Sequence, residues 1–365
     1  MKSCCYRRRV AFLLVVLSSA VAVTAGWAQA PAPTSALARE PACQSLTPAA
    51  VGGPMPKDPA VMVLRWLGTA AHELVYQDQV MLLDAYYERG PRLARVRPLG
   101  FKREDVKRAT AIFVGHGHFD HVGDAPFVAE RTGARVFGGP PTAEWLRSVK
   151  LPERQIVAVK GGEVDEFKGL VVESILAHHS AGDPSGPRVG TRPNEAAALA
   201  VRAAVGAVWG EPTEAERKAE EEVWARGTFD PRISEEGTIA FLFSLANGFR
   251  VLYLDSAGPI TEGERRVMQR IGRVDVAIVA YQGRPLVQEQ VRVTMGLAQL
   301  FNPRVFIPTH HDEVVPGTFF FLPTEPLLMA IRDELPETRG IAPLYRTPIC
   351  IDTKTGEVFV GDRAK

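Results

Sequence analysis

The histidines of this chain are concentrated in a few places, and this feature most limits the folds available to it. The stretch GHGHFDHVGD, residues 115–124, contains three histidines and two aspartates, although the whole chain has 8 histidines. Two further pairs stand at residues 178–179 and 310–311, and only His72 stands apart. Each of the three clusters follows an apolar run typical of a strand. The fold must therefore bring several strand ends to one edge.

The order of the apolar segments predicts a layered α/β domain. Residues 61–87 contain three apolar runs separated by a glycine turn and a polar turn, a pattern typical of successive strands. Strand, helix, strand and helix then alternate from residue 108 to 150, which indicates α/β layers. Later strands are predicted within residues 169–180, 238–248, 249–258, 274–283 and 304–313.

Two segments interrupt this rhythm. Residues 29–57 are rich in Ala, Pro and Gly without a period, so we predict a linker or a loosely held arm. Residues 185–237 contain an Ala-rich and a charged helical piece with little strand signal, which indicates a helical insertion in a domain spanning 58–365. Within it, Trp209 and Trp224 are interpreted as core residues rather than as a substrate platform.

The first residues have the layout of a secretory signal peptide. Four basic residues precede an apolar run from Val10 to Val23, and small residues follow. Cleavage after Ala28 avoids placing Pro31 beside the scissile bond, so we predict a signal peptide at residues 1–28. The alternative is a retained membrane anchor, but the run is shorter than the ~20 apolar residues that a span requires. The protein is thus expected to be exported, to the periplasm or the extracellular space.

The charge balance argues against nucleic acid as an obligate partner. The whole chain has 43 basic and 42 acidic residues. Removal of residues 1–28 takes away four basic and no acidic residues, which leaves the mature chain slightly acidic. Proteins that bind nucleic acid usually carry a basic footprint. We expect a small-molecule substrate instead; a membrane surface stays open as a partner.

Cys43 and Cys350 are the cysteines that remain after removal of the signal peptide. In an oxidising compartment such a pair can form a disulfide, and the alternative is two free buried thiols. Because one lies near each end of the mature chain, we predict that the two are close enough to bridge.

The residues of the opening motif suit a metal ion. His116 and His118 are two apart at a strand end and can converge on one cation, and Asp120 and His121 follow after a turn. The strand at 249–258 delivers Asp255 to the same kind of position. Imidazoles with carboxylates suit Zn²⁺ and, less exclusively, Fe or Mn. The absence of cysteine from the clusters favours a hydrolytic over a purely structural site.

HGHFDH resembles the HxHxDH signature of the metallo-β-lactamase fold, an αββα sandwich of two mixed sheets flanked by helices. The hairpin at 64–87 resembles the opening of the branch that includes ascorbate-phosphate lactonase and related hydrolases. ILAHHS resembles the segment that gives the third histidine, which favours His179 over His178. YLDSAG stands where the family has its bridging aspartate, Asp255, and IPTHHDE where it has P-x-H, which favours His310 over His311.

This resemblance implies two metal ions. One would bind His116, His118 and His179, and the other Asp120, His121 and His310, with Asp255 between them. Two zinc ions would lower the pKa of a shared water, forming hydroxide near neutral pH, and Asp120 would orient that water. Ser256 replaces the more usual Thr after the aspartate.

The predicted function is an exported binuclear zinc hydrolase acting on an ester, lactone, amide or phosphodiester. The fold supports many chemistries, so it does not identify the substrate. Alternatives are a nuclease, a phosphodiesterase acting on phospholipid, a β-lactamase and a metal-binding protein without turnover. Asp120 favours an enzyme, because a pure binding site needs no carboxylate beside the water.

Overall fold

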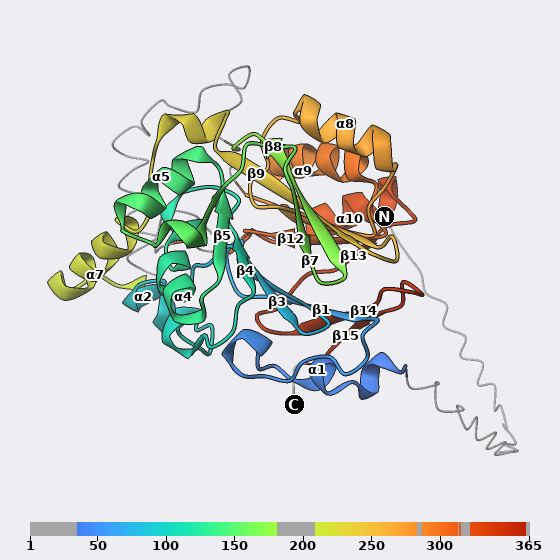
Figure 1. Ribbon diagram of the computed structural model, residues 1–365, viewed down its shortest axis with the longest axis horizontal. Coiled ribbons are helices and arrows are strands. Elements are labelled where there is room, and N and C mark those ends of the chain that lie inside the picture. The colour runs from blue at the N-terminus through green and yellow to red at the C-terminus, as the bar shows by residue number, and fades with distance from the viewer. Residues whose placement is uncertain (1–34, 181–208, 283–286, 313, 315–321, 363–365) are drawn as a thin grey trace, which may run out of the picture. The chain divides into compact units, whose positions relative to one another are not determined.

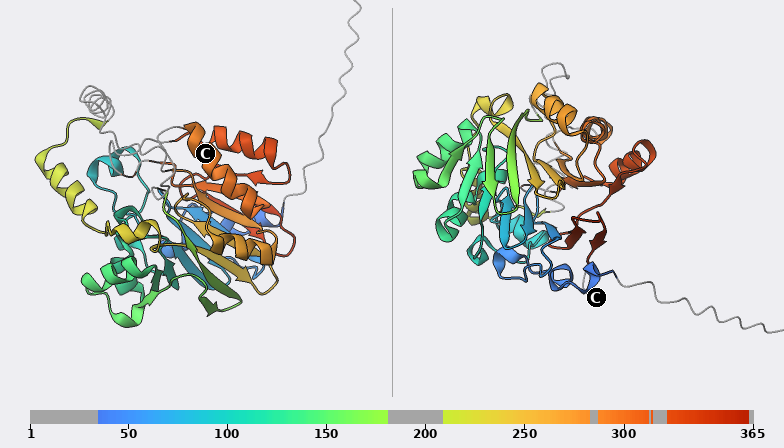
Figure 2. Two further views of the ribbon diagram at one scale, coloured as in Figure 1. Left: turned by 90° about the horizontal axis from the view of Figure 1, so that it is seen from above. Right: turned by 45° about the vertical axis from the view of Figure 1, so that its right-hand side comes forward.

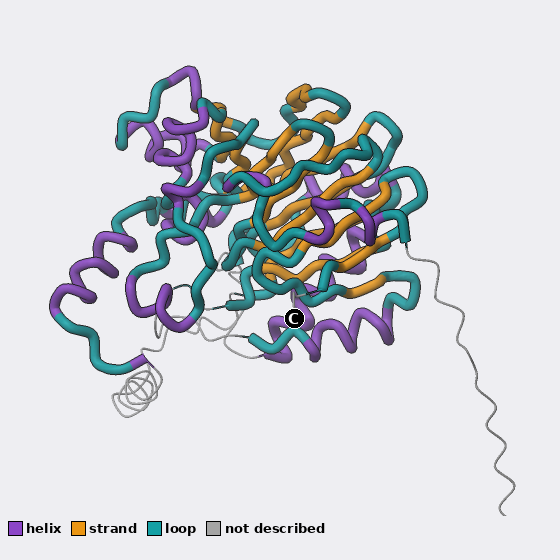
Figure 3. Tube along the Cα trace, turned by 90° about the horizontal axis from the view of Figure 1, so that it is seen from below, coloured by secondary structure: helices purple, strands orange, loops and turns teal. Residues whose placement is uncertain are grey.

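The computed structural model describes residues 35–180, 209–282, 287–312, 314 and 322–362, all within the compact unit Ser35–Lys365 (Figure 1). The predicted signal peptide and residues 181–208 of the predicted insertion lie outside the described residues. Two mixed sheets lie face to face and helices cover their outer faces, as two further views show (Figure 2). In Figure 3 the strands run side by side and the helices surround them.

The first sheet, called sheet A, has 8 strands and contains the predicted opening strands. Strands β15, β14, β1, β2 and β3 pair in antiparallel fashion, and β3 to β6 pair in parallel. In spatial order its strands are β15 (Val358–Val360), β14 (Pro348–Asp352), β1 (Val61–Trp66), β2 (His72–Tyr76), β3 (Gln79–Leu83), β4 (Ala111–Phe113), β5 (Arg135–Gly138) and β6 (Ile156–Ala158).

The second sheet, called sheet B, has 7 strands and carries three of the predicted site segments. Strands β7 to β10 pair in antiparallel fashion, and β10 to β13 pair in parallel. In spatial order its strands are β13 (Arg339–Gly340), β12 (Val305–Thr309), β11 (Val276–Ala280), β10 (Arg250–Leu254), β9 (Thr238–Leu245), β8 (Leu170–Ala177) and β7 (Val164–Phe167).

The helices form two outer layers and a lateral group. Sheet A is covered by the N-terminal turns η1 (Leu37–Arg39), α1 (Pro41–Gln44) and η2 (Ala49–Val51) and by α4 (Ala125–Thr132) and α5 (Pro140–Ser148). Sheet B is covered by α8 (Glu262–Ile271), α9 (Val287–Phe301) and α10 (Glu325–Glu334). The remaining described helices are α2 (Pro91–Val96), η3 (Arg103–Asp105), α3 (Phe119–Val122), η4 (Glu153–Gln155), α7 (Glu214–Trp224) and η5 (Pro231–Ser234).

The alternation along the strands explains the three layers of core. In β1, Met62 and Leu64 face the core between the sheets, whereas Val63 packs under the N-terminal turns and α4. All residues of β1 are buried, because each face of the sheet is covered. The predicted α/β fold with two mixed sheets and flanking helices is therefore confirmed.

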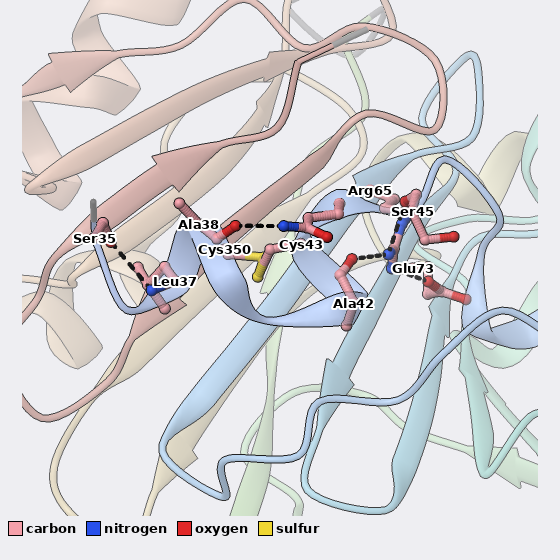
Figure 4. The surroundings of a disulfide bond; sticks show 10 residues. Ser35, Leu37, Ala38, Ala42, Cys43, Ser45, Arg65, Glu73 and Cys350 are labelled. Carbon is pink, nitrogen blue, oxygen red and sulfur yellow. Dashed lines mark hydrogen bonds and ion pairs between the residues drawn. A yellow bond between two sulfur atoms is a disulfide. The ribbon is translucent and has the colours of Figure 1, made fainter. Parts of the chain in front are cut away.

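The prediction of a linker is wrong from Ser35 onward. Cys43 is buried and forms a disulfide with Cys350 of β14, with 5.9 Å between the Cα atoms, as predicted (Figure 4). Beside it, Arg65 donates to the carbonyl of Ala42 and pairs with Glu73 at 2.9 Å, and both side chains are fully buried. An Ala- and Pro-rich sequence gives no periodic signal, yet its small residues fit closely against a sheet.

The described part of the predicted insertion is helical. The charged piece forms α7, which lies beside α2 at the side of the sandwich (Figure 1) and is held there by an Arg92–Glu220 ion pair at 2.7 Å. The side chain of Thr213 caps α7, and the carboxylate of Glu216 accepts a hydrogen bond from the backbone N–H of Thr213. Among the helices of the described ranges, none is both long and apolar enough to cross a membrane.

Candidate metal centre

The seven predicted site residues come from strand ends that meet at one edge of the sandwich. His116 and His118 follow β4, and Asp120 and His121 lie in the short helix α3 directly after them. β8, β10 and β12 run in the same direction in sheet B, so the residues after them, His179, Asp255 and His310, reach the same edge. The structure brings all seven residues together; their role as metal ligands stays a prediction.

One group of three histidines faces a common point. The Nε2 atom of His116 lies 2.9 Å from Nδ1 of His118, and the ring of His179 lies 4.6 Å and 4.8 Å from these two rings, measured between centroids. Each of the three residues offers one ring nitrogen within 4.8 Å of the others. This spacing suits three imidazoles around a single ion.

A second group combines a carboxylate with two imidazoles. Nε2 of His310 lies 3.2 Å from both Nε2 of His121 and Oδ2 of Asp120, and Nε2 of His121 lies 3.5 Å from the same oxygen. All three side chains are buried. The donor atoms therefore converge in a mixed nitrogen and oxygen environment, which suits Zn²⁺, Fe or Mn.

Asp255 lies between the two groups. Its Oδ2 is 2.7 Å from Nδ1 of His116 and 3.0 Å from Nδ1 of His121, while its buried Oδ1 has no hydrogen-bond partner among the described residues. A Cβ atom on Gly115 would lie 2.0 Å from the Asp255 carboxyl carbon, so only glycine permits this approach. A buried carboxylate oxygen without a donor is costly unless a cation neutralises it. The residues present thus fit a pair of divalent metal ions.

The pKa values of His118 and His179 favour the neutral form of these two side chains. Burial, together with the neighbouring His116, lowers the pKa of His118 to about 3. Burial and the same neighbours hold the pKa of His179 well below its usual value. Neutral imidazole is the form that binds metal, so these two ligands release no proton when an ion enters.

The second group has the opposite electrostatics. Burial alone would raise the pKa of Asp120, but the facing His121 and His310 outweigh it and hold that pKa far below its usual value. Burial would lower the pKa of His121, yet Asp120, Asp84 and Asp255 together raise it well above its usual value. The centre therefore concentrates negative charge, which a metal dication would balance.

The structure places the two members of each adjacent histidine pair in different surroundings. His179 belongs to the first donor group and His178 to none of the described groups. His310 belongs to the second, whereas His311 turns away and stacks on Trp66, with ring centroids 4.4 Å apart. His310 has a backbone φ of 56°, a conformation uncommon for residues other than glycine, so its orientation depends on its surroundings.

Asp84 was not identified from the sequence. It directly follows β3, is fully buried, and its Oδ2 lies 2.6 Å from Nδ1 of His121. Its other oxygen accepts from the backbone N–H of Gly115 at 2.9 Å. Such a partner fixes the ring of a ligand histidine and leaves Nε2 free for metal. A carboxylate directly after the buried run VMLL was the available signal.

A buried ion pair supports the His310 loop from the other side. Arg89 donates to Asp312 at 2.8 Å, Tyr345 also donates to Asp312, and Asp312 accepts from the backbone N–H of Thr69 at 2.9 Å. The carbonyl of Thr69 in turn accepts from the N–H of His310 at 2.8 Å. This chain of bonds fixes the left-handed conformation of His310.

A cavity of about 200 Å³ opens over the cluster. Besides metal-site residues it is lined by Phe119, Trp224 and Phe229, and the last two come from the predicted insertion. The interpretation of Trp224 as a core residue is wrong in this respect, because its half-buried ring faces the cavity; Trp209 is buried, as interpreted. Phe229 has no sequence signal that distinguishes it from other loop residues.

The insertion is also bonded to the segments that carry the cluster. The N–H of Thr228 donates to the carbonyl of Gly117 at 2.7 Å, and a Cβ atom on Gly227 would lie 2.4 Å from the nitrogen of Phe119. The N–H of His179 donates to the carbonyl of Ser234 at 3.2 Å. Residues 226–234 therefore form one wall of the site.

Comparison with known proteins agrees with this picture. The domain family described as "Beta-lactamase superfamily domain" matches residues 80–209. A UPF0173 metal-dependent hydrolase of Cupriavidus taiwanensis is 26% identical over 293 residues, which cover 79% of this chain and 83% of that protein. One from Myxococcus xanthus is 41% identical over 80 residues, 21% of this chain and 28% of the relative. One from Agrobacterium fabrum is 36% identical over 33% of this chain and 49% of the relative.

Solved structures show the same fold at low sequence identity. Igni18, a metallo hydrolase from the archaeon Ignicoccus hospitalis, aligns with a TM-score of 0.52 at 14% identity, covering 80% of this chain and 98% of that one. A variant of the CmlA β-hydroxylase aligns with a TM-score of 0.50 at 15% identity, covering 82% of this chain and 54% of that one. The chain therefore shares the fold of these solved structures, and its sequence is similar to the Beta-lactamase superfamily domain over residues 80–209 and to the UPF0173 metal-dependent hydrolases.

Proposed function

We propose that this protein is an exported, binuclear metal-dependent hydrolase of small molecules. The observation that carries the proposal is the pair of adjoining donor groups, His116–His118–His179 and Asp120–His121–His310, with Asp255 between them. A site that only stored one ion would need a single closed group of ligands. The relatives named metal-dependent hydrolases support the same class of reaction.

Two divalent cations, when bound, would supply Lewis acidity and lower the pKa of a water molecule between them. The chain's own groups would do the rest. The Asp120 carboxylate, ionised at neutral pH, would accept a hydrogen bond from the attacking water and orient it. Asp84 would hold the His121 ring in place through its Nδ1 atom. The half-buried walls of the cavity would limit access of bulk water to the scissile bond.

The substrate class proposed is an ester, lactone, amide or phosphodiester, with an ester or lactone favoured. No lysine or arginine stands among the described residues that line the cavity, so those residues offer no cation for a phosphate group. The sequence resemblance to ascorbate-phosphate lactonase-like hydrolases also favours a lactone. A phosphodiesterase acting on phospholipid or nucleic acid is the alternative, and its substrate would depend on the metal ions alone for charge recognition.

Zinc is the metal proposed, because five histidines and two aspartates without cysteine suit zinc hydrolases, and Fe or Mn would occupy the same donors. Export is proposed from the signal-like N-terminus. The Cys43–Cys350 disulfide supports it, because disulfides persist in oxidising compartments and are rare in the cytosol.

The test is metal analysis of the mature protein combined with a panel of chromogenic esters, lactones, β-lactams and phosphodiesters. Near two equivalents of zinc and turnover of an ester or lactone that a chelator abolishes would support the proposal. Turnover of phosphodiesters alone would favour the alternative reaction. Two bound ions with no turnover on any class would favour a metal-binding protein.

A further inference from the structure

Three aromatic side chains stand beside the metal centre and have no part in the proposed chemistry. Phe119 packs against Trp224 with ring centroids 4.4 Å apart, and Trp224 lies 6.1 Å from Phe229 with the ring planes 24° apart. Phe229 also lies 5.2 Å from the ring of His118. The three rings are called the aromatic wall below. They line the cavity together with the metal-site residues.

Phe229 is unusual among the three aromatic residues because it is exposed. Its side chain is 58% exposed although it stands at the mouth of a cavity that Trp224 and Phe119 line from within. Burying a ring of this size normally stabilises a protein. An exposed ring beside a reactive centre gains that contact only when a ligand covers it.

The wall is held in a fixed position relative to the metal-binding loop. The Thr228 N–H donates to Gly117, which lies between His116 and His118, and Gly227 fits against Phe119 where any side chain would collide. Arg226 adds an ion pair at 3.5 Å with the buried carboxylate of Asp124, the residue before α4. Residues 226–229 therefore cannot move away without disturbing the histidine motif.

The volume of the cavity and the charges of its lining limit the class of ligand that fits it. The cavity measures about 200 Å³, and its charged described residues are those of the metal centre. A cavity of about 150 Å³ lined by apolar side chains accepts benzene in another protein. Outside the metal centre the described lining is uncharged, with Ser180, Ser256 and Gln282 as its polar members. The part of the ligand that faces the aromatic wall is therefore uncharged, and the volume is large enough for one ring.

We propose that the aromatic wall recognises a neutral aromatic ring of the substrate. This ring is bonded directly to the carbonyl carbon or to the leaving-group oxygen of the bond that the metal centre would hydrolyse. This inference rests on the proposed function for the reaction, but recognition of the ring is independent of turnover. If the proposal is right, the protein prefers an aryl ester or aryl lactone as substrate. A purely polar pocket would instead prefer aliphatic lactones and sugar lactones.

The binding test uses the zinc-loaded mature protein and two ketones that no hydrolase cleaves, acetophenone and 2-butanone, followed by saturation-transfer NMR. Phe229→Ala and Trp224→Ala should each weaken acetophenone binding about 10-fold and change 2-butanone binding less than 2-fold, because ring contacts contribute beyond burial. Phe229→Leu keeps an apolar side chain and should recover only part of the loss. Met329→Ala, on the exposed face of α10, is the matched control and should change neither.

The kinetic test compares dihydrocoumarin with δ-valerolactone, which share a six-membered lactone and differ by one fused benzene ring. The ratio of variant to parent kcat/KM cancels the intrinsic reactivity of each lactone. Phe229→Ala should lose about 10-fold on dihydrocoumarin and less than 2-fold on δ-valerolactone.

Equal losses on both ligands of a pair, no loss on either, or full recovery in Phe229→Leu would each overturn the inference. A preference for acetophenone that depends on Phe229, in a protein that cleaves none of the panel substrates, would sustain the aromatic wall and refute the hydrolase. Melting temperatures of the variants identify any that fail to fold, and exposed Phe229 is the position least subject to that failure.

Discussion

Substitution of Asp120 best distinguishes the hypothesis of a hydrolase from that of a metal-storing protein. Asp120 is one of seven potential ligands, and five histidine rings and Asp255 stay in place without its charge. Asp120→Asn should therefore weaken metal binding without emptying the site. The attacking water needs an ionised carboxylate, so kcat should fall by about 10² or more.

This is measured as kcat and zinc content on the same zinc-loaded samples. Asp333→Asn, which removes an exposed carboxylate of α10, is the control and should behave like the parent. Equal activity in Asp120→Asn and the parent would contradict the mechanism and make a non-catalytic metal protein the better reading.

The pair His178 and His179 gives a second test at single-residue resolution. Adjacent residues at a strand end point to opposite sides, and only His179 offers a ring nitrogen to the described donor groups. His179→Ala should release about one equivalent of metal, whereas His178→Ala should keep nearly all of it. Metal analysis after dialysis checks this, and the assignment fails if His178→Ala strips metal and His179→Ala does not.

Single site residues could be predicted from the sequence where several sequence features pointed to the same residue. The HxHxDH spacing predicted four residues of the cluster, and the family resemblance selected His179, Asp255 and His310 from the other strand ends. Asp84 was missed because a single aspartate after a strand resembles many N-terminal caps and turns. Phe229 was missed because its position depends on Gly227 and Thr228 packing against Gly117, a contact between segments more than a hundred residues apart.

Among the elements, α8 carries a group that makes stability depend on pH. Glu264 closes the capping box of this helix by accepting from the backbone N–H of Thr261 at 2.7 Å, and burial raises its pKa to about 7 from an ordinary 4.5. Between these two values the unfolded chain releases a proton that the folded protein keeps. The free energy of unfolding therefore falls as pH rises from 4.5 to 7, and the loss is complete above pH 7.

Glu264→Gln should reduce that dependence. Glutamine keeps the oxygen that accepts from Thr261 and cannot ionise, so the variant should gain on the order of 1–3 kcal/mol relative to the parent between pH 5 and pH 8. Urea unfolding at both pH values measures the difference. Glu262→Gln removes an exposed carboxylate from the same helical turn and should leave the pH dependence unchanged. A parallel shift of parent and Glu264→Gln would refute the role of Glu264.

The elements that the sequence predicted correctly are those with a clear pattern of apolar residues. β1, β9, β11 and β12 were found because each is a largely apolar run that is covered on both faces, and the remaining predicted strands because apolar residues recur along them. The segment 35–57 was taken for a linker because its order comes from residues outside it, Arg65 and Glu73 in the first two strands and Cys350, 307 residues after Cys43. Local pattern cannot reveal order that distant residues impose.

For the whole molecule, the Cys43–Cys350 disulfide closes a loop of 307 residues. A cross-link over so long a loop removes chain entropy from the unfolded state, on the order of 5 kcal/mol at most. The double variant Cys43→Ser/Cys350→Ser should therefore melt several degrees below the oxidised parent. Differential scanning calorimetry with and without reductant measures this.

Reductant should lower the melting temperature of the parent and have no effect on the double variant, which is the matched control. An oxidised and a fully reduced parent that melt at the same temperature, with reduction verified by thiol titration, would show that the bond adds no stability.

The same bond has a consequence for the order in which the protein is made. A ribosome synthesises Cys43 more than three hundred residues before its partner, and β1 likewise precedes β14, its neighbour in sheet A, by almost the whole chain. Early in synthesis β1 can pair with β2 on one of its edges, but its other edge and Cys43 lack their partners until β14 has emerged. During that interval the edge of β1 and the turns above it are exposed to other chains. For this architecture, completion of sheet A is a late event that follows synthesis and does not accompany it.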